Sequence, residues 1–183
     1  TKAGISRYDG HELKKYVYSP NNPHSIPNNL IHQIAEDEMS NIWILTDKGI
    51  ARYQRQSDDF FLPTDEKGNP IIAYSTCLTK DGVLFGSKDK VYFYSYRDSS
   101  LRLLQKLNKG NNFNISLLSL WNEHTVLCCS RWQGLALLDL KTGKHRLPPF
   151  DCGKEIMNML IDSQNRIWIA PYNEGIKCFT HNG

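Results

Sequence analysis

The sequence predicts an all-β protein made of β-propeller blades, and the main reason is an internal repeat. A turn with an acidic residue, an apolar strand centred on tryptophan and a bend containing glycine occupy residues 34–53. The same order returns at residues 159–179, and the acidic residue precedes the tryptophan by six positions in both copies. A repeat at fixed spacing indicates stacked units of one kind.

The spacing between the copies matches a propeller blade. Trp43 aligns with Leu84, Leu127 and Trp168 at intervals of 41, 43 and 41 residues, with four short strands in each interval and no helical periodicity. The strands around both tryptophans are apolar on both faces, as expected of strands sandwiched between neighbouring blades. A sandwich of the immunoglobulin type would also have many short strands, but not this repeated register. We therefore expect about four four-stranded antiparallel blades, an excerpt of a larger propeller.

The repeat also sets the predicted boundaries. Residues 1–8 match residues 46–53 at five of eight positions, so the chain is expected to open within a repeat of a longer protein. Asp9-Gly10, between strand-like residues, predicts a hairpin turn. The expected units are the end of a preceding blade at 1–24, blades at 25–66, 67–109 and 110–151, and an incomplete blade at 152–183. The isolated segment is expected to associate edge to edge, because its terminal blades would expose apolar faces.

The recurring polar and glycine residues have structural explanations. Aspartate in a tight turn bonds its own backbone, and tryptophan fills the core between blades. Glycine where the chain enters a third strand suits positive φ or close backbone approach. The structural residues of the repeat are expected to be Asp37, Trp43, Gly49, Asp162, Trp168 and Gly175.

The composition argues against several classes of protein. The net charge of +3 is small and the basic residues are scattered, so this segment is not expected to bind nucleic acid. No apolar run approaches the roughly 18 residues of a membrane span. The five cysteines contain no Cys-x-x-Cys pair, and neither a cofactor nor a metal site is expected. Four of the cysteines lie in apolar strand-like runs and are expected to be buried free thiols, namely Cys77, Cys128, Cys129 and Cys178.

No catalytic pattern is evident. The histidines form no His-x-x-x-His pair, and the sequence has neither a Gly-x-Ser-x-Gly elbow nor a glycine-rich phosphate loop. Paired carboxylates such as Asp58-Asp59 fall in a turn, where they are expected to be solvated. The segment is therefore not expected to be an enzyme.

The best-preserved copy has a recognisable order of residues. A polar acidic turn, Asn-Ile-Trp-Ile, a threonine and Gly-Ile-Ala-Arg-Tyr follow one another within residues 36–53. This order resembles the two-component-regulator propeller repeat, and residues 25–31 are similar to the lead-in of that family. The middle copies have drifted, since the second lacks the tryptophan and the Gly-Ile pair and the third has Trp121 in place of the acidic residue. The resemblance covers the whole chain by period and about half of it by motif.

Proteins with this repeat are hybrid two-component sensors of glycan-degrading bacteria. The resemblance implies a sensor segment on the periplasmic face of the inner membrane, within a parent protein that is a histidine kinase. It also implies that the sensor recognises an oligosaccharide, works as a homodimer and controls transcription of glycan-utilisation genes through a phosphorelay. The remaining propeller blades of the parent chain would be its structural partners.

Loops between second and third strands are the expected ligand site, because they gather on one face of a propeller. Two of them combine an aromatic ring with planar hydrogen-bonding groups, which suit the apolar faces and hydroxyl edges of sugars. The candidate ligand-binding residues are Arg131, Trp132, Gln133, Tyr172, Asn173 and Glu174. Trp132 and Tyr172 could instead only fill gaps between blades. The alternative function is a protein-interaction propeller scaffold without a small-molecule ligand.

Overall fold

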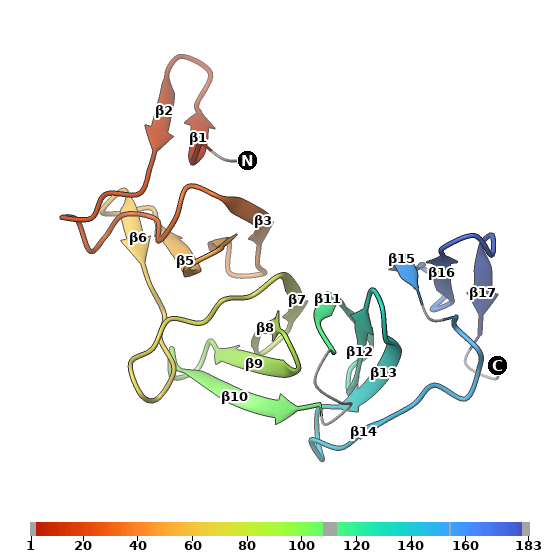
Figure 1. The fold of residues 1–183 in the computed structure, drawn as a ribbon. Coiled ribbons are helices and arrows are strands. Elements are labelled where there is room, and N and C mark those ends of the chain that lie inside the picture. The colour runs from red at the N-terminus through yellow and green to blue at the C-terminus, as the bar shows by residue number, and fades with distance from the viewer. Residues whose placement is uncertain (1–2, 108–112, 154, 181–183) are drawn as a thin grey trace. The chain divides into compact units, whose positions relative to one another are not determined.

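The computed structural model describes residues 3–107, 113–153 and 155–180. Throughout these residues the only regular secondary structure is β, in five antiparallel sheets (Figure 1), so the predicted all-β fold class is confirmed. In the described ranges no helix is long and apolar enough to cross a membrane. The chain divides into two compact units, residues 1–74 (unit 1) and 75–183 (unit 2).

Unit 1 contains a two-stranded and a four-stranded sheet. The first sheet pairs β1 (Ile5–Tyr8) with β2 (Leu13–Tyr16), and the second runs through β3 (Ile31–Glu36), β4 (Ile42–Thr46), β5 (Gly49–Gln54) and β6 (Asp59–Phe61). The β1–β2 loop is longer than the Asp9-Gly10 turn that the sequence suggested. It spans four residues, because Oδ1 of Asp9 accepts the backbone N–H groups of both His11 and Glu12.

Unit 2 contains three consecutive sheets, each with its strands paired in chain order. The first is formed by β7 (Ser75–Thr79), β8 (Gly82–Ser87), β9 (Lys90–Ser95) and β10 (Leu101–Lys106), and the second by β11 (Ile115–Asn122), β12 (Thr125–Ser130), β13 (Gly134–Asp139) and β14 (His145–Arg146). The third consists of β15 (Ile156–Ile161), β16 (Ile167–Pro171) and β17 (Lys177–Phe179).

The repeated register of the sequence is present in the sheets. The aligned residue lies in the second strand of every sheet with three or more strands, between equivalent partners on the first and third strands. These sets are Ala35, Trp43 and Arg52; Cys77, Leu84 and Phe93; Ser119, Leu127 and Leu137; Leu160, Trp168 and Cys178. The four sheets are therefore copies of one meander, and β1–β2 is a shorter two-stranded element.

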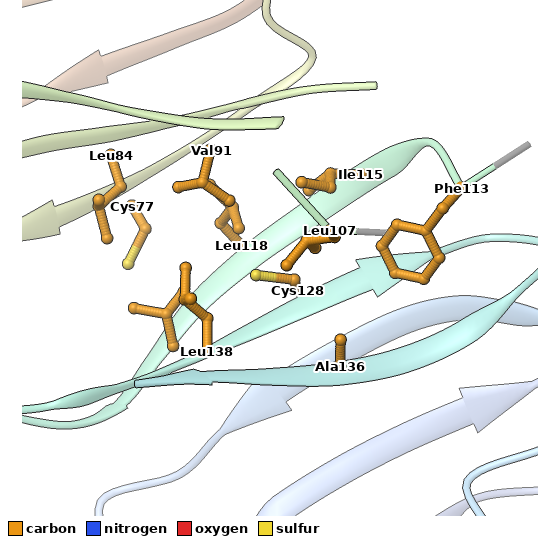
Figure 2. Close-up of a cluster of buried hydrophobic side chains, with 11 residues drawn as sticks. Cys77, Leu84, Val91, Leu107, Phe113, Ile115, Leu118, Cys128, Ala136 and Leu138 are labelled. Carbon is orange, nitrogen blue, oxygen red and sulfur yellow. The ribbon is translucent and has the colours of Figure 1, made fainter. Parts of the chain in front are cut away.

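Apolar packing between neighbouring sheets forms the core of unit 2. Cys77, Leu84 and Val91 of the first sheet face Leu118 and Cys128 of the second (Figure 2). A second apolar cluster joins β12 and β13 to the sheet of β15–β17. Strands β8 and β12 are buried on both faces, which explains why their sequences do not alternate between apolar and polar residues.

Backbone hydrogen bonds connect the same neighbouring sheets at one end. Ile115, which opens β11, donates its N–H to the carbonyl of Lys88 at 2.8 Å. Ile156, which opens β15, donates its N–H to the carbonyl of Arg131 at 2.9 Å. In both cases the acceptor follows the second strand of the preceding sheet, so the start of one sheet is tied to the second-to-third loop of the sheet before it.

The cysteine side chains differ in burial, and burial raises the pKa of a thiol. Cys77, Cys128, Cys129 and Cys152 are buried and free, and burial raises the pKa of Cys77 to about 11 and that of Cys129 to about 12. The expectation for Cys178 was wrong, because it is exposed on β17, the outermost strand of a three-stranded sheet.

In unit 1 the acidic turn bonds both the backbone and the tryptophan. Oδ1 of Asp37 accepts the N–H groups of Met39 at 3.0 Å and Asn41 at 2.8 Å. Oδ2 accepts the indole N–H of Trp43 at 2.7 Å, and this ring is fully buried. A tight turn and the start of the next strand together span six residues. At this spacing one carboxylate reaches both the backbone N–H groups of the turn and the indole N–H of the strand.

The last sheet repeats the arrangement. Oδ1 of Asp162 accepts the N–H groups of Gln164 and Arg166, and its Oδ2 accepts the Trp168 indole N–H at 2.8 Å. The indole hydrogen bond, followed by the Arg166 amide, holds the pKa of Asp162 well below its usual range. The carboxylate is therefore an ionised structural acceptor.

We expect Asp37→Ala to lower the free energy of unfolding by about 3 kcal/mol, because it leaves a buried indole N–H without its charged acceptor. Asp65→Ala is the matched control. Asp65 makes the same turn, accepting the N–H groups of Lys67 and Asn69, but Ile71 stands where the tryptophan would be. Urea denaturation followed by circular dichroism compares the two, and equal losses would contradict a special role for the indole bond.

A second carboxylate fastens the β1–β2 sheet to the β5–β6 turn. Asp58 accepts hydrogen bonds from Arg7, Lys14, Tyr16 and Tyr53. The bond from Lys14, followed by those from the two tyrosines, holds the pKa of Asp58 well below its usual range. The prediction that Asp58 and Asp59 would be solvated was wrong, because both side chains are partly buried and Asp58 forms the junction.

This junction predicts a dependence of stability on acid pH. A depressed folded-state pKa contributes stability that is complete above the unfolded value near 3.8 and is lost as the pH falls below it. Between pH 7 and pH 2.5 the wild type should therefore lose more thermal stability than Asp58→Asn. Asp81→Asn, in the β7–β8 turn, serves as the control and should lose as much as the wild type. An unchanged pH profile in Asp58→Asn would refute the junction.

Candidate functional site

The first candidate cluster is the three-residue loop between β12 and β13. The pairing of Ser130 with Gly134 closes this loop, so residues 131–133 project from the end of the hairpin. All three are exposed, and Trp132 keeps 58% of its surface accessible. The Arg131 guanidinium lies 5.1 Å from the centre of the Trp132 ring and covers one of its faces. The opposite face of the indole is the one available to a ligand.

The second cluster lies between β16 and β17. Tyr172 is 55% exposed, and Asn173 has a φ of 60°, a left-handed conformation that asparagine tolerates. One oxygen of Glu174 forms an ion pair, because its Oε2 lies 2.6 Å from Nζ of Lys177, the first residue of β17. This ion pair raises the pKa of Lys177 and orients the carboxylate.

A short segment of backbone joins the two clusters. The carbonyl of Arg131 accepts the N–H of Ile156 at 2.9 Å, and the carbonyl of Glu155, one residue earlier, accepts the N–H of Tyr172 at 2.7 Å. The two loops therefore flank the beginning of β15. We call residues 131–133 and 172–174 together the loop pair.

Several neighbours of the loop pair were not singled out from the sequence. Met157 is exposed and its sulfur lies 3.5 Å from Nη2 of Arg131. Asp151 approaches Lys177, with 3.8 Å between Oδ2 and Nζ. These residues belong to the start of β15 and to the segment before it, so the sequence offered no sign that they lie beside a loop more than 20 positions away.

Glycines shape both loops. Gly134, the first residue of β13, has a φ of 78°, and Gly175, two residues before β17, has a φ of 75°. A Cβ on Gly134 would lie 3.3 Å from the carbonyl oxygen of Gly153, whereas a Cβ on Gly175 would meet nothing within 4 Å. Gly49, the corresponding residue of unit 1, opens β5 beside Pro27 and Pro70.

Unit 1 has an aromatic and polar group of its own at the equivalent loop. Nε2 of His32 hydrogen-bonds Oδ1 of Asp47, and the His32 ring lies 5.4 Å from that of Tyr74. Lys48 lies over the ring of Tyr18 at 6.0 Å. Sequence reasoning passed over this group because its members come from four separate segments of the chain.

The loop pair has the chemistry of a binding surface. It offers two exposed rings, a guanidinium and a carboxylate, together with the side-chain amides of Gln133 and Asn173. Rings with planar donors and acceptors beside them can stack on a sugar and bond its hydroxyls. Within the described ranges no group of three His, Cys, Asp or Glu residues could hold a metal ion.

No family model and no curated protein matches the sequence. Among solved structures, the chain is similar to the extracellular domain of the hybrid two-component system BT3049 of B. thetaiotaomicron, with a TM-score of 0.72 and 18% identity over 99% of this chain and 25% of that one. It is also similar to the extracellular domain of the hybrid two-component system BT4673 of the same organism, with a TM-score of 0.76 and 19% identity over 100% of this chain and 25% of that one.

A third similar structure is the computationally designed protein Ika4, with a TM-score of 0.61 and 15% identity over 91% of this chain and 97% of the designed one. At these identities the comparisons establish the fold. The expected resemblance to the sensor regions of hybrid two-component systems is confirmed at that level, and the chain spans about a quarter of the two bacterial domains.

We expect Gly134→Ala to destabilise the protein by about 1–3 kcal/mol, since alanine would adopt the left-handed conformation and also press on the Gly153 carbonyl. Gly175→Ala has the same backbone strain without the contact and should cost less. Urea denaturation of both variants tests this order, and a larger loss in Gly175→Ala would show that the Gly153 contact is unimportant.

Proposed function

We propose that this chain is a ligand-sensing, extracytoplasmic propeller segment of a hybrid two-component sensor, and that the loop pair contacts an oligosaccharide. The observation that carries the proposal is the placement of two exposed aromatic rings, Trp132 and Tyr172, on loops joined through residues 155 and 156. Exposed aromatic rings with polar groups beside them provide an apolar face and hydrogen-bonding partners in one place, as a sugar ligand requires.

The polar groups of the loop pair favour a sugar over a purely apolar ligand. Arg131 lies over one face of Trp132, and Lys177 orients Glu174 from one side only. The remaining indole face and the free Glu174 oxygen can then serve as a stacking platform and a hydroxyl acceptor. Pre-set side chains of this kind reduce the entropy lost on binding.

The solved structures support the sensory setting of the proposal. The two bacterial relatives in fold are extracellular domains of hybrid two-component systems. By this likeness we place the segment on the periplasmic side of the inner membrane, within a larger propeller and a dimeric histidine kinase parent. Its output would be a phosphorelay that controls transcription of glycan-utilisation genes.

Both loops are hydrogen-bonded to the start of β15, so a ligand bound at the loops would also act on the sheets. One loop belongs to the β11–β14 sheet and the other to the β15–β17 sheet. A ligand that contacts both would hold these sheets in one relative position, and the hydrogen bonds of residues 155 and 156 would transmit that constraint to β15. A signal would then begin as a change in packing between two neighbouring sheets.

We expect Trp132→Ala and Tyr172→Ala in the intact sensor each to weaken oligosaccharide binding at least about tenfold, or 1.4 kcal/mol. Each change removes a stacking surface and leaves the backbone hydrogen bonds in place. Isothermal titration calorimetry with a library of neutral and acidic oligosaccharides measures the effect. Tyr8→Ala is the control, because Tyr8 is an exposed aromatic residue on β1 in unit 1.

Unchanged affinity in both loop variants would overturn the assignment of the site. No binding of any oligosaccharide by the wild type, together with retained binding of a protein partner, would favour the interaction scaffold over the sensor.

A further inference from the structure

Two buried cysteines of unit 2 belong to one apolar cluster beside the loop pair. Cys129 lies on β12, one residue before that strand ends, and Cys152 lies in the segment that leads to β15. Both are members of the cluster that joins the β11–β14 sheet to the β15–β17 sheet. The structure holds both side chains as thiols, and the proposed ligand site uses neither of them.

The pairing of β12 with β13 places both cysteines at the same end of one hairpin. Cys129 is the strand partner of Leu135, and Gly134 comes directly before Leu135 at the start of β13. A Cβ on Gly134 would lie 3.8 Å from Sγ of Cys152. The Cys152 sulfur therefore lies beside the residue that precedes the strand partner of Cys129.

The Cys129 side chain points to the face of the sheet on which Cys152 lies. Successive side chains of a strand alternate between the two faces of a sheet. Cys128 belongs to the apolar cluster on the other face, together with Cys77 (Figure 2), whereas Cys129 belongs to the cluster of Cys152. The two adjacent cysteines therefore place one thiol on each face, and only that of Cys129 faces Cys152.

Electrostatics also indicate that the two sulfurs are close. Burial is the main reason that the pKa of Cys129 rises to about 12, and the charge of Cys152 raises it further. Coulombic energy falls with separation, so an effect of this kind requires neighbouring groups. In the other cluster, burial raises the pKa of Cys77, and a backbone hydrogen bond with Leu120 opposes the rise.

A cation lies beside the more accessible of the two cysteines. Nζ of Lys177 is 3.5 Å from the carbonyl oxygen of Asp151, the residue before Cys152. The hydrogen bond with Glu174 is the main reason that the pKa of Lys177 is raised, and the charges of Asp151 and Cys152 add to it. An ammonium group near a cysteine favours the thiolate, which is the reactive form. Cys152 is 7% exposed and Cys129 is fully buried, so Cys152 is the thiol that meets an oxidant.

We propose that Cys129 and Cys152 form a disulfide bond in an oxidising compartment, and that this bond fastens together the two sheets that carry the loop pair. It would join the end of β12 to the segment just before β15. The formation of this bond in the cell rests on the extracytoplasmic location in the proposed function, because disulfides persist in such compartments and are rare in a reducing cytosol.

The oxidation requires an external disulfide as the electron acceptor, supplied by glutathione disulfide or by a thiol–disulfide oxidoreductase. The Cys152 thiolate attacks one sulfur of this disulfide and releases a first thiol, which leaves a mixed disulfide on Cys152. Cys129 then gives up its proton, and its sulfur attacks Sγ of Cys152 and releases a second thiol. Two protein thiols are thereby oxidised, and one external disulfide is reduced to two thiols that carry the two protons.

Peptide mass spectrometry of the full-length protein tests the disulfide. The purified protein is equilibrated with reduced and oxidised glutathione, and the remaining thiols are alkylated before digestion. We expect the peptides of residues 129 and 152 to be linked in the wild type and in Cys128→Ser, and not in Cys129→Ser. Cys128→Ser is the matched control, because residues 128 and 129 are adjacent and lie on opposite faces of β12.

Alkylation of both Cys129 and Cys152 at every glutathione ratio would overturn the inference, and so would linkage of Cys152 to any other cysteine. Protein purified from cells without a reductant should already carry the link. If it is reduced in cells but becomes linked in glutathione, the pairing is supported, and the extracytoplasmic location in the proposed function is contradicted.

Hydrogen exchange tests whether the bond fastens the sheets. Reduction of the linked wild type should speed exchange at the amides of Ile156 and Tyr172 at least about threefold, because the sheets then separate more often. These amides form the hydrogen bonds that connect the loops. Cys129→Ser should show no change with reductant. Equal exchange in the oxidised and reduced wild type would overturn the fastening role.

Discussion

The hydrogen bond from an indole to a turn carboxylate organises the two sheets that keep the full motif, β3–β6 and β15–β17, and the Trp43 indole of the first is fully buried. Asp37 and Asp162 each close a tight turn with one oxygen and hold a tryptophan of the next strand with the other. A buried carboxylate and a buried indole N–H would each be costly alone, but together they satisfy one another. The carboxylate thereby fixes the conformation of the turn and the position of the tryptophan ring on the next strand together.

The drifted sheets keep the register without this bond. Leu84 and Leu127 replace the tryptophan, and apolar packing against neighbouring sheets supplies the stability. Trp121, which stands where other copies have aspartate, donates its indole N–H to the carbonyl of Asn165 at 3.3 Å. Asn165 belongs to the Asp162 turn, so the β11–β14 sheet is bonded to the turn of the sheet that follows it.

The residues that differ most between the copies of the repeat lie in the loops, and packing between neighbouring sheets brings two of these loops together. The first residue of β15 is bonded to the loop before β13, and this contact brings residues 131–133 and 172–174 to either side of one strand end. Constant positions of the repeat maintain the sheets, while loop positions are free to change. The exposed rings of Trp132 and Tyr172, and the His32 group of unit 1, occur at such positions. A proposed ligand site at the loops therefore requires no departure from the fold.

The fold class, the register of the repeat and the aromatic residues of two loops could be predicted from the sequence, because period and local turn chemistry are properties of neighbouring residues. Which loops meet could not, since Tyr172 and Arg131 are joined through the backbone of Glu155 and Ile156. The same holds for the indole bonds, the Lys177–Glu174 pair, the Asp58 junction and the exposure of Cys178 and Ile34. These depend on how sheets pack, and packing brings together residues whose separation along the chain carries no periodic signal.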